Sequence, residues 1–394
     1  MSGERKHATH ENEVSLDQDY RFEDVKNTVE HVSYSTISDL NVTLNYSVHT
    51  FYYPWYGNPK IDNGSFYHWN HEYMPHWNAV ERVKWPSGRH VPPNDIGSNF
   101  YPALGCYSSR DPAVIHQHMK WIASARIGVI IVTWYPPDVV GEVRPGQTWD
   151  DMTKLIMDIA DQYFIKVAFH IEPYDGRSAQ SVAQNLQHIM MLFSSHSAFF
   201  TYKSPYTNVT KPLVYVYDSY LIPNDDWKMV LGSKSETSIR GTRYDMHVVG
   251  LILKVTDQAR MLSSHFDGYY TYFAVNGFTQ ASEWSRWLSL AKLASRNQLI
   301  FVPCVGPGYI DDRVRPWNKV NTRFRFNGSY YSRSWQSALK SRSPIVAVTS
   351  FNEWHEGTQI EPAVPRKNYS DYRPQDPEFY LRETARFVGM FENP

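Results

Sequence analysis

The sequence contains only two cysteines among its 394 residues, Cys106 and Cys304. Two cysteines are too few for a disulfide framework, and their spacing matches no metal-binding motif. No apolar run approaches the ~18 residues that a membrane-spanning helix requires. The N-terminal stretch MSGERKHATHENEVSLDQDY is polar and charged, without the apolar core of a signal peptide. We therefore expect a soluble chain that either lacks its targeting segment or does not enter the secretory pathway.

An excess of charge is also missing, because 39 lysine and arginine residues balance 40 aspartate and glutamate residues. This balance gives no support to a nucleic-acid or membrane-surface partner. No Gly-x-Ser-x-Gly turn and no P-loop occur, so acyl and phosphoryl transfer lose support. No Gly-x-Gly-x-x-Gly follows the first apolar run, which disfavours a doubly wound dinucleotide-binding sheet.

Aromatic residues, by contrast, are abundant at 15% of the chain, with 28 tyrosines and 13 tryptophans. Tyrosine and tryptophan combine an apolar face with a polar edge, as a sugar ring does. Their surplus suits a carbohydrate cleft, although packing between layers also uses such rings. Six Asn-x-Ser/Thr sequons are consistent with a secretory lumen: Asn41, Asn45, Asn63, Asn208, Asn327 and Asn368.

The order of apolar segments predicts the fold. Residues 1–40 are polar and lack apolar periodicity, which predicts a disordered or stem-like arm before one catalytic domain over 41–394. Eight β-rich apolar runs follow, at 47–53, 128–135, 166–171, 213–218, 248–253, 266–272, 299–305 and 345–351. Amphipathic helices are predicted between them, for example over 113–125, 151–163, 178–193 and 283–295. A helix over 377–391, with Asp376 as its N-cap, closes the domain.

Strands that alternate with helices through eight units predict an α/β fold, a single (β/α)8 barrel. Residues 54–110 would then form an elaborated loop at the barrel mouth. In such barrels the chemistry sits where the strands end. Here the ends carry Tyr, Trp and carboxylates in YYPWYGN (52–58), TWYPP (133–137), HIEPY (170–174), YDSY (217–220), FDGYYTY (266–272), GPGY (306–309) and SFNEWHEGT (350–358). Any one of these residues could merely cap a strand, but the whole ring predicts a binding site.

Glu353 and Glu356 stand out in this ring. Glycoside hydrolysis typically uses two carboxyl groups, one protonated to assist the leaving oxygen and one ionised. Two glutamates three residues apart on a post-strand turn can face one pocket, where their charges push their pKa values apart. Such a pair alone usually marks a solvated helix face. Its position after an apolar strand, beside Asn352 and His355, makes it the catalytic candidate.

The histidines give weaker patterns. His68, His71 and His76 lack the matched ligand spacing of a zinc site. His116 and His118 lie two apart on a predicted helix and do not share a face. We therefore predict no metal and no other cofactor. A metal-dependent hydrolase that uses the histidine-rich insertion remains an alternative, which would lose turnover to chelators.

At the strand ends the chain resembles the endo-α-1,2-mannosidase family, glycoside hydrolase family 99. The resembling segments run in order from about residue 47 to the C terminus. They are FYYPWYGNP (51–59), NFYPALGCYSSRDP (99–112), VTWYPP (132–137), VAFHIEPYDGR (167–177), VYVYDSY (214–220), FDGYYTYFA (266–274), PCVGPGYIDD (303–312), RPWN (315–318) and TSFNEWHEGTQIEPA (349–363).

The resemblance implies endo-hydrolysis of an α-1,2-mannosidic bond, with release of glucosylated mannose from immature N-glycans in the Golgi lumen and without a catalytic metal. By position in NEWHEG, Glu356 would be the general acid/base, and Glu353 the base for the substrate's own 2-hydroxyl. Retention would proceed through a 1,2-anhydro sugar. Golgi members carry an N-terminal membrane anchor, which this sequence lacks.

The resemblance also implies substrate contacts at matching positions. Trp134 and Tyr135 would form the wall against the next sugar outward, where Tyr135 favours glucose; bacterial mannan-degrading relatives have Trp there. The mannose subsite and its surroundings would comprise Tyr53, Tyr56, His170, Glu172, Tyr269, Tyr272, Asn352 and His355. A non-catalytic carbohydrate-binding barrel and the bacterial mannanase specificity are the alternatives.

Overall fold

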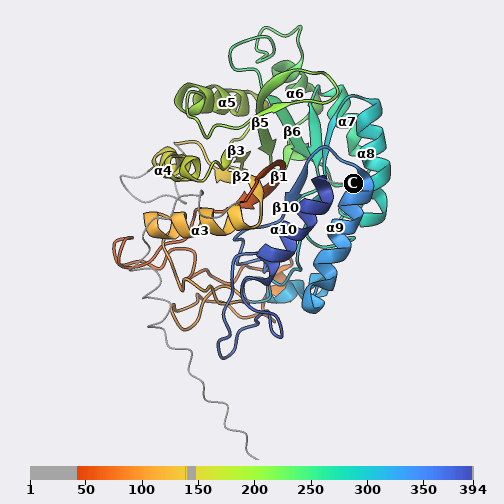
Figure 1. Cartoon of the computed structure of the whole chain (residues 1–394). Coiled ribbons are helices and arrows are strands. Elements are labelled where there is room, and N and C mark those ends of the chain that lie inside the picture. Colours follow the sequence, from red (N-terminus) through yellow and green to blue (C-terminus); the bar gives the residue numbers. More distant parts are fainter. Residues whose placement is uncertain (1–41, 138, 140–147, 393–394) are drawn as a thin grey trace, which may run out of the picture. The chain divides into compact units, whose positions relative to one another are not determined.

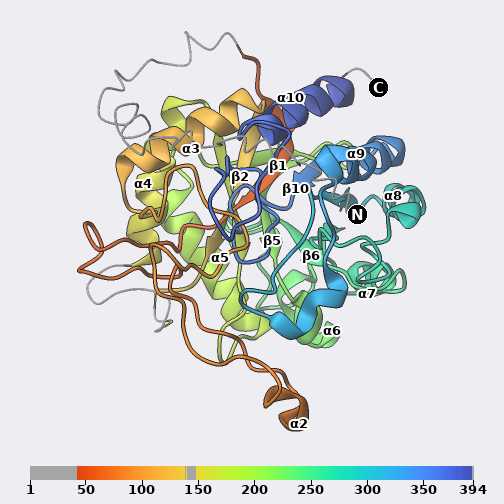
Figure 2. The ribbon, with the colours of Figure 1, turned by 90° about the horizontal axis from the view of Figure 1, so that it is seen from below.

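The computed structural model describes residues 42–137, 139 and 148–392. The predicted N-terminal arm lies outside these residues, so its boundary stays a prediction. All described residues belong to one unit, Thr36–Pro394. Strands occupy the centre of this unit and helices lie outside them (Figures 1 and 2).

Nine parallel strands form the central sheet. They are β1 (Asn45–Tyr52), β2 (Ile127–Trp134), β3 (Lys166–Ile171), β5 (Thr210–Val216), β6 (His247–Leu251), β7 (Gly268–Tyr270), β8 (Ile300–Val302), β9 (Cys304–Val305) and β10 (Val346–Val348). Their order is β8-β7-β6-β5-β3-β2-β1-β10-β9. The two ends of this order, β8 and β9, are separated in the chain by Pro303 alone, so the sheet closes on itself. The predicted (β/α)8 barrel is confirmed.

Side chains alternate between the inside and the outside of this barrel. Phe51 on β1 contacts Tyr215 on β5 and Tyr270 on β7, with ring centroids 5.9 Å apart in both pairs. These strands are not neighbours in the sheet, so the three rings meet in the barrel interior. Residues at the intervening positions, such as Ile130 and Tyr269, belong to the apolar layer between strands and helices.

Eight helices follow the barrel strands or close the domain. They are α3 (Pro112–Ser124), α4 (Trp149–Gln162), α5 (Ala179–Phe193), α6 (Asn224–Leu231), α7 (Asp257–Ser263), α8 (Trp287–Arg296), α9 (Ser329–Ser341) and α10 (Phe379–Glu392). Short elements add to them: strand β4 (Thr201–Lys203) pairs antiparallel with β5, and helix α2 (Ala79–Arg82) lies in the loop after β1. Within the described part of the chain, no helix combines the length and the apolar character needed to cross a bilayer.

Several predicted boundaries differ from those observed, for local reasons. α4 begins at Trp149, two residues early, because Thr148 and Asp151 form a capping box. α10 begins at Phe379, because Asp376 instead accepts the Glu378 N–H in a turn before the helix. The predicted strand 266–272 shortens to β7, and Tyr272 beyond it has a φ of 49°, which extended backbone does not adopt.

Asp267, just before β7, lies at the end of the barrel where the strands begin. Hydrogen bonds and charge hold several groups to its carboxylate there. Arg240 donates to Asp267 at 2.7 Å and to Asp245 at 3.0 Å, and the Val248 N–H donates to Asp267 at 2.8 Å. Burial acts to raise the pKa of Asp267. The hydrogen bond from His247, the Arg240 charge and the Val248 N–H outweigh it, so the pKa is lowered.

We predict that Arg240→Met lowers the free energy of unfolding by about 2 kcal/mol at pH 7, because Asp245 and Asp267 both lose the guanidinium that bridges them. A lowered aspartate pKa stabilises the fold above the unfolded pKa of ~4, and this contribution is lost as the pH falls through the folded value. Urea denaturation at pH 7 and near pH ~2.5, below the unfolded pKa, should therefore show a smaller difference between variant and wild type at the lower pH. The matched control is Arg243→Met at an exposed neighbour, and an equal loss in both variants would contradict the prediction.

Candidate active site

A pocket of about 240 Å³ opens where the barrel strands end. Its walls include seven of the residues predicted from the sequence: Tyr53, His170, Glu172, Tyr272, Glu353, His355 and Glu356. Seven further lining residues are outside that prediction: Trp55, His68, His71, Met74, Tyr217, Val314 and Arg315. The predicted group lies at the ends of β1, β3, β7 and β10, so the barrel topology brings together side chains that are far apart in sequence.

Glu353 is buried at the base of the loop after β10. Its Oε1 accepts the His355 N–H at 3.1 Å, and its own N–H donates to Ser350 Oγ at 2.7 Å. Burial raises the pKa of Glu353 well above its usual range, and the charge of Glu356 raises it further. Arg315 and the His355 N–H act in the opposite direction and offset only part of this rise.

Glu356 lies on the same loop and is more exposed, with 22% of its side chain accessible. Burial raises the pKa of Glu356 to about 7, even though Arg315 Nη1, 3.8 Å away, favours the ionised form. Arg315 is itself held by Asp311 at 3.2 Å. Both glutamates have raised pKa values, and because the two groups interact, their titration belongs to the pair rather than to one residue.

Asn352 and Tyr56 lie behind the pocket and not in its wall. The Tyr53 N–H donates to Asn352 Oδ1 at 2.7 Å, and Asn352 Nδ2 donates back to the Tyr53 carbonyl at 3.0 Å. The Tyr56 hydroxyl donates to the Asn352 carbonyl and accepts the Trp354 N–H, both at 3.1 Å. These bonds join the end of β1 to the loop that carries both glutamates, so the two residues position the pocket.

A second buried network supports the same loop. Glu361, which is fully buried, accepts from Trp354 Nε1 at 2.9 Å and from the Tyr107 hydroxyl at 2.8 Å. His118 Nε2 lies 3.2 Å from the same carboxylate. His118 is completely buried, on the inner face of α3.

The opposite wall of the pocket is built on β3, β5 and β7. His170 Nε2 lies 2.8 Å from the Tyr270 hydroxyl, and its Nδ1 lies 2.9 Å from Glu172 Oε1. The Tyr53 and Tyr272 hydroxyls are hydrogen-bonded at 2.5 Å. Burial raises the pKa of both tyrosines, so they remain protonated and can donate hydrogen bonds to a ligand.

Three of the predicted contact residues lie elsewhere. The prediction for Tyr269 is wrong, because its side chain points outward and its hydroxyl donates to the Leu290 carbonyl of α8 at 2.8 Å. Trp134 also does not line the pocket, because it is fully buried and its Nε1 donates to Asp150 of α4. Tyr135 is half-buried and packs on Trp149, with ring centroids 5.2 Å apart; its contact with an outer sugar stays a prediction.

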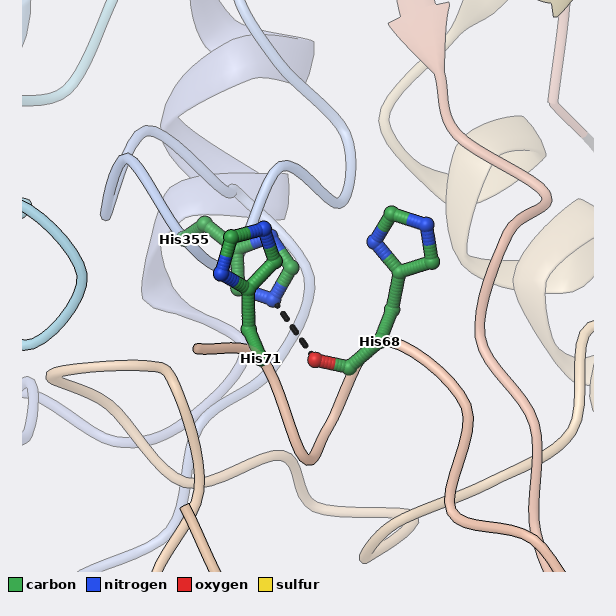
Figure 3. Close-up of side chains that lie close together, drawn as sticks. All are labelled: His68, His71 and His355. Atoms are coloured by element: carbon green, nitrogen blue, oxygen red, sulfur yellow. Dashed lines mark hydrogen bonds between the residues drawn. The ribbon is translucent and has the colours of Figure 1, made fainter. Parts of the chain in front are cut away.

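Other site residues were accessible to sequence reasoning. Tyr217 follows β5 in the same way that the predicted residues follow their strands, and Arg315 opens the segment RPWN. His68 and His71, from the loop after β1, lie beside His355 at the pocket edge (Figure 3). No sequence spacing could show this group, because 287 positions separate His68 from His355.

Comparison with known proteins agrees with this site. The sequence model of Glycosyl hydrolase family 99 matches residues 43–393. Glycoprotein endo-alpha-1,2-mannosidase of Rattus norvegicus is 44% identical over 384 residues, which cover 95% of this chain and 82% of that protein. Glycoprotein endo-alpha-1,2-mannosidase-like protein of Danio rerio is 47% identical over 350 residues, covering 88% and 78%.

Solved structures give the same result. The GH99 endo-alpha-mannosidase from Bacteroides thetaiotaomicron superposes with a TM-score of 0.81 at 41% identity, covering 89% of this chain and 99% of that one. Fold and relatives together define the class as a glycoside hydrolase on a (β/α)8 barrel. The chain belongs to glycosyl hydrolase family 99, as the sequence resemblance predicted, and is an endo-acting glycosidase.

We predict that Tyr56→Phe lowers kcat about tenfold and leaves KM nearly unchanged, because the hydroxyl positions the catalytic loop from behind. Losing the buried donor and acceptor should cost about 1–2 kcal/mol of stability. The control is Tyr174→Phe, whose half-buried hydroxyl bonds Asn185 and Ser181 on α5 outside the pocket. Steady-state kinetics at matched folded fractions would contradict the assignment if KM rose while kcat held, as a direct substrate contact predicts.

Proposed function

We propose that this chain hydrolyses an α-1,2-mannosidic bond in a glucosylated high-mannose N-glycan and releases a glucosyl-mannose disaccharide. The observation that carries the proposal is the pairing of Glu353 and Glu356 in one pocket rimmed by tyrosines. The names of the relatives support a glycoprotein glycan as the substrate class. The pocket is lined by polar groups and aromatic faces, which is the mixed surface that a sugar ring requires.

The Golgi lumen is the proposed site of this reaction. Of the described sequon asparagines, Asn63, Asn208, Asn327 and Asn368 are exposed, as glycan attachment requires. Asn41 lies outside the described residues. A membrane anchor stays an expectation from the family resemblance.

In the proposed mechanism Glu356 is the general acid. It protonates the leaving oxygen while Glu353 removes the proton of the 2-hydroxyl, and O2 attacks C1 from the opposite side. The products of this step are the shortened glycan and a 1,2-anhydro sugar, with one inversion at C1. Glu356, now ionised, deprotonates a water that attacks C1, and O2 regains its proton from Glu353. The second inversion restores the original anomeric configuration.

The electrostatics of the pocket suit these roles once substrate is bound. A pKa near 7 keeps Glu356 protonated in about half of the molecules at neutral pH, as general acid catalysis favours. Glu353 must be ionised to act, and a 2-hydroxyl that donates to it stabilises that form. Sugar binding therefore favours the ionised form of Glu353 and leaves Glu356 as the residue that carries the proton.

We predict that Glu356→Gln lowers the rate on the natural glycan by on the order of 10²–10⁴. The loss should shrink on a mannosyl fluoride, whose leaving group needs no protonation. Glu353→Gln removes the base and should lose a similar factor on both substrates. Measured kcat/KM values for the two variants on the two substrates decide the assignment, and the reverse pattern would exchange the two roles.

Product analysis tests the substrate. With a glycan ending in glucosyl-α-1,3-mannosyl-α-1,2-mannose, we expect a disaccharide at the same rate with or without EDTA. Release of single sugars would contradict endo-action, and faster cleavage of unglucosylated mannan would indicate the bacterial specificity. Binding without turnover would support the carbohydrate-binding alternative.

A further inference from the structure

Three imidazoles meet at the edge of the pocket without a role in the proposed hydrolysis. His68 and His71 come from the loop after β1, and His355 comes from the loop after β10 (Figure 3). One nitrogen of each lies within 4.8 Å of the others. Nitrogens that share a tetrahedral zinc ion lie about 3.3 Å apart, given Zn–N bonds of ~2.0–2.1 Å. Small rotations of these rings would therefore bring them to one ion.

Backbone carbonyls fix the ring tautomers of two of these histidines. His355 Nε2 lies 3.0 Å from the His68 carbonyl, which can only accept, so Nε2 carries the proton and Nδ1 the lone pair. His71 Nδ1 lies 2.7 Å from the Glu72 carbonyl, so its lone pair is on Nε2. Histidines that bind metals typically donate their other N–H to a carbonyl or carboxylate in this way.

The neutral state of the rings and the carboxyl groups nearby also suit a cation. Burial lowers the pKa of His355 and of His71, so both rings are neutral at neutral pH, as metal ligands must be. Glu172, Glu353 and Glu356 line the same pocket. Among the described lining residues the one opposing guanidinium belongs to Arg315, which is paired with Asp311 at 3.2 Å.

We propose that His68, His71 and His355 bind one divalent transition-metal ion such as Zn²⁺, and that this ion inhibits the enzyme. Imidazole ligands suit Zn²⁺, Cu²⁺ and Ni²⁺, whereas Mg²⁺ and Ca²⁺ prefer oxygen ligands. Glu353 Oε1 lies 3.7 Å from His355 Nδ1, so its carboxylate is in reach as a fourth ligand. A metal-bound Glu353 could no longer accept the proton of the 2-hydroxyl.

The inhibitory part of this inference rests on the proposed role of Glu353, and the binding part does not. Hydrolysis itself uses no metal in the mechanism above, so the ion acts as a reversible inhibitor. The two parts are measured separately: zinc binding without any sugar, and hydrolysis with and without zinc.

The binding experiment uses the protein freed of metal by EDTA and desalting, titrated with Zn²⁺ against a chromophoric chelator. We expect one Zn²⁺ per chain, and at least about 100-fold weaker binding in His71→Ala, which removes a ligand. His76→Ala is the matched control, because His76 lies in the same loop but stacks on Trp77 outside the pocket; it should bind zinc as the wild type does. Mg²⁺ should not compete.

The inhibition experiment compares each protein with its own metal-free rate. Zn²⁺ should inhibit the wild type and His76→Ala with equal potency, EDTA should restore the rate, and His71→Ala should require at least about 100-fold more zinc. Equal zinc affinity in wild type and His71→Ala would overturn the site. Stoichiometric zinc binding at full hydrolytic rate would overturn the inhibition alone. An inactive but zinc-binding wild type would contradict the proposed hydrolysis and leave the metal site supported.

Discussion

The pocket depends on the junction between the last strand of the barrel and the first. Closing a barrel requires that a strand from the C-terminal part of the chain lie beside one from the N-terminal part, and here β10 pairs with β1 in parallel. The paired hydrogen bonds between Asn352 and the Tyr53 backbone continue this contact past the strand ends. Because Glu353 directly follows Asn352, the register of β1 against β10 sets the position of the loop that carries both glutamates relative to the pocket tyrosines.

The junction consists of buried polar groups, so each of them requires a hydrogen-bond partner. A buried donor or acceptor without a partner costs about 1–3 kcal/mol, so a loop of this kind is stable only when its polar groups are nearly all satisfied. Tyr56 satisfies a carbonyl and an N–H of the loop, and Glu361 satisfies the Trp354 indole. Once these bonds are made, the loop has few other arrangements available. Burial that fixes the loop also raises the pKa values of both glutamates, so rigidity and proton storage have the same physical origin.

Sequence reasoning captured what depends on local pattern and on topology. Apolar runs predicted the barrel strands, and the strand-end segments that carry the family resemblance predicted half of the residues that line the pocket. Sequence reasoning failed where adjacent residues of a strand point to opposite faces of the sheet and the pattern does not show which residue faces inward. Tyr269 and Tyr270 are adjacent, and only the observed register shows that Tyr269 faces α8 while Tyr270 faces the barrel interior. It also failed for the loop after β1, whose histidines reach the pocket along a path without periodicity.

The proposed mechanism explains why one short loop can carry both glutamates. In ordinary retaining glycosidases the nucleophile must reach C1 from the face opposite the acid, about 5–5.5 Å away, so the two carboxyl groups flank the sugar. When the substrate supplies its own nucleophile, the base needs to reach only the 2-hydroxyl, and O2 covers the remaining distance to C1. Acid and base then act on oxygens of neighbouring carbons, O1 and O2, which two residues three apart on one turn can reach. In the proposed mechanism the anchoring of that turn by Asn352 and Tyr56 positions both proton-transfer groups at once, and Tyr53, His170 and Tyr272 are left to hold the sugar.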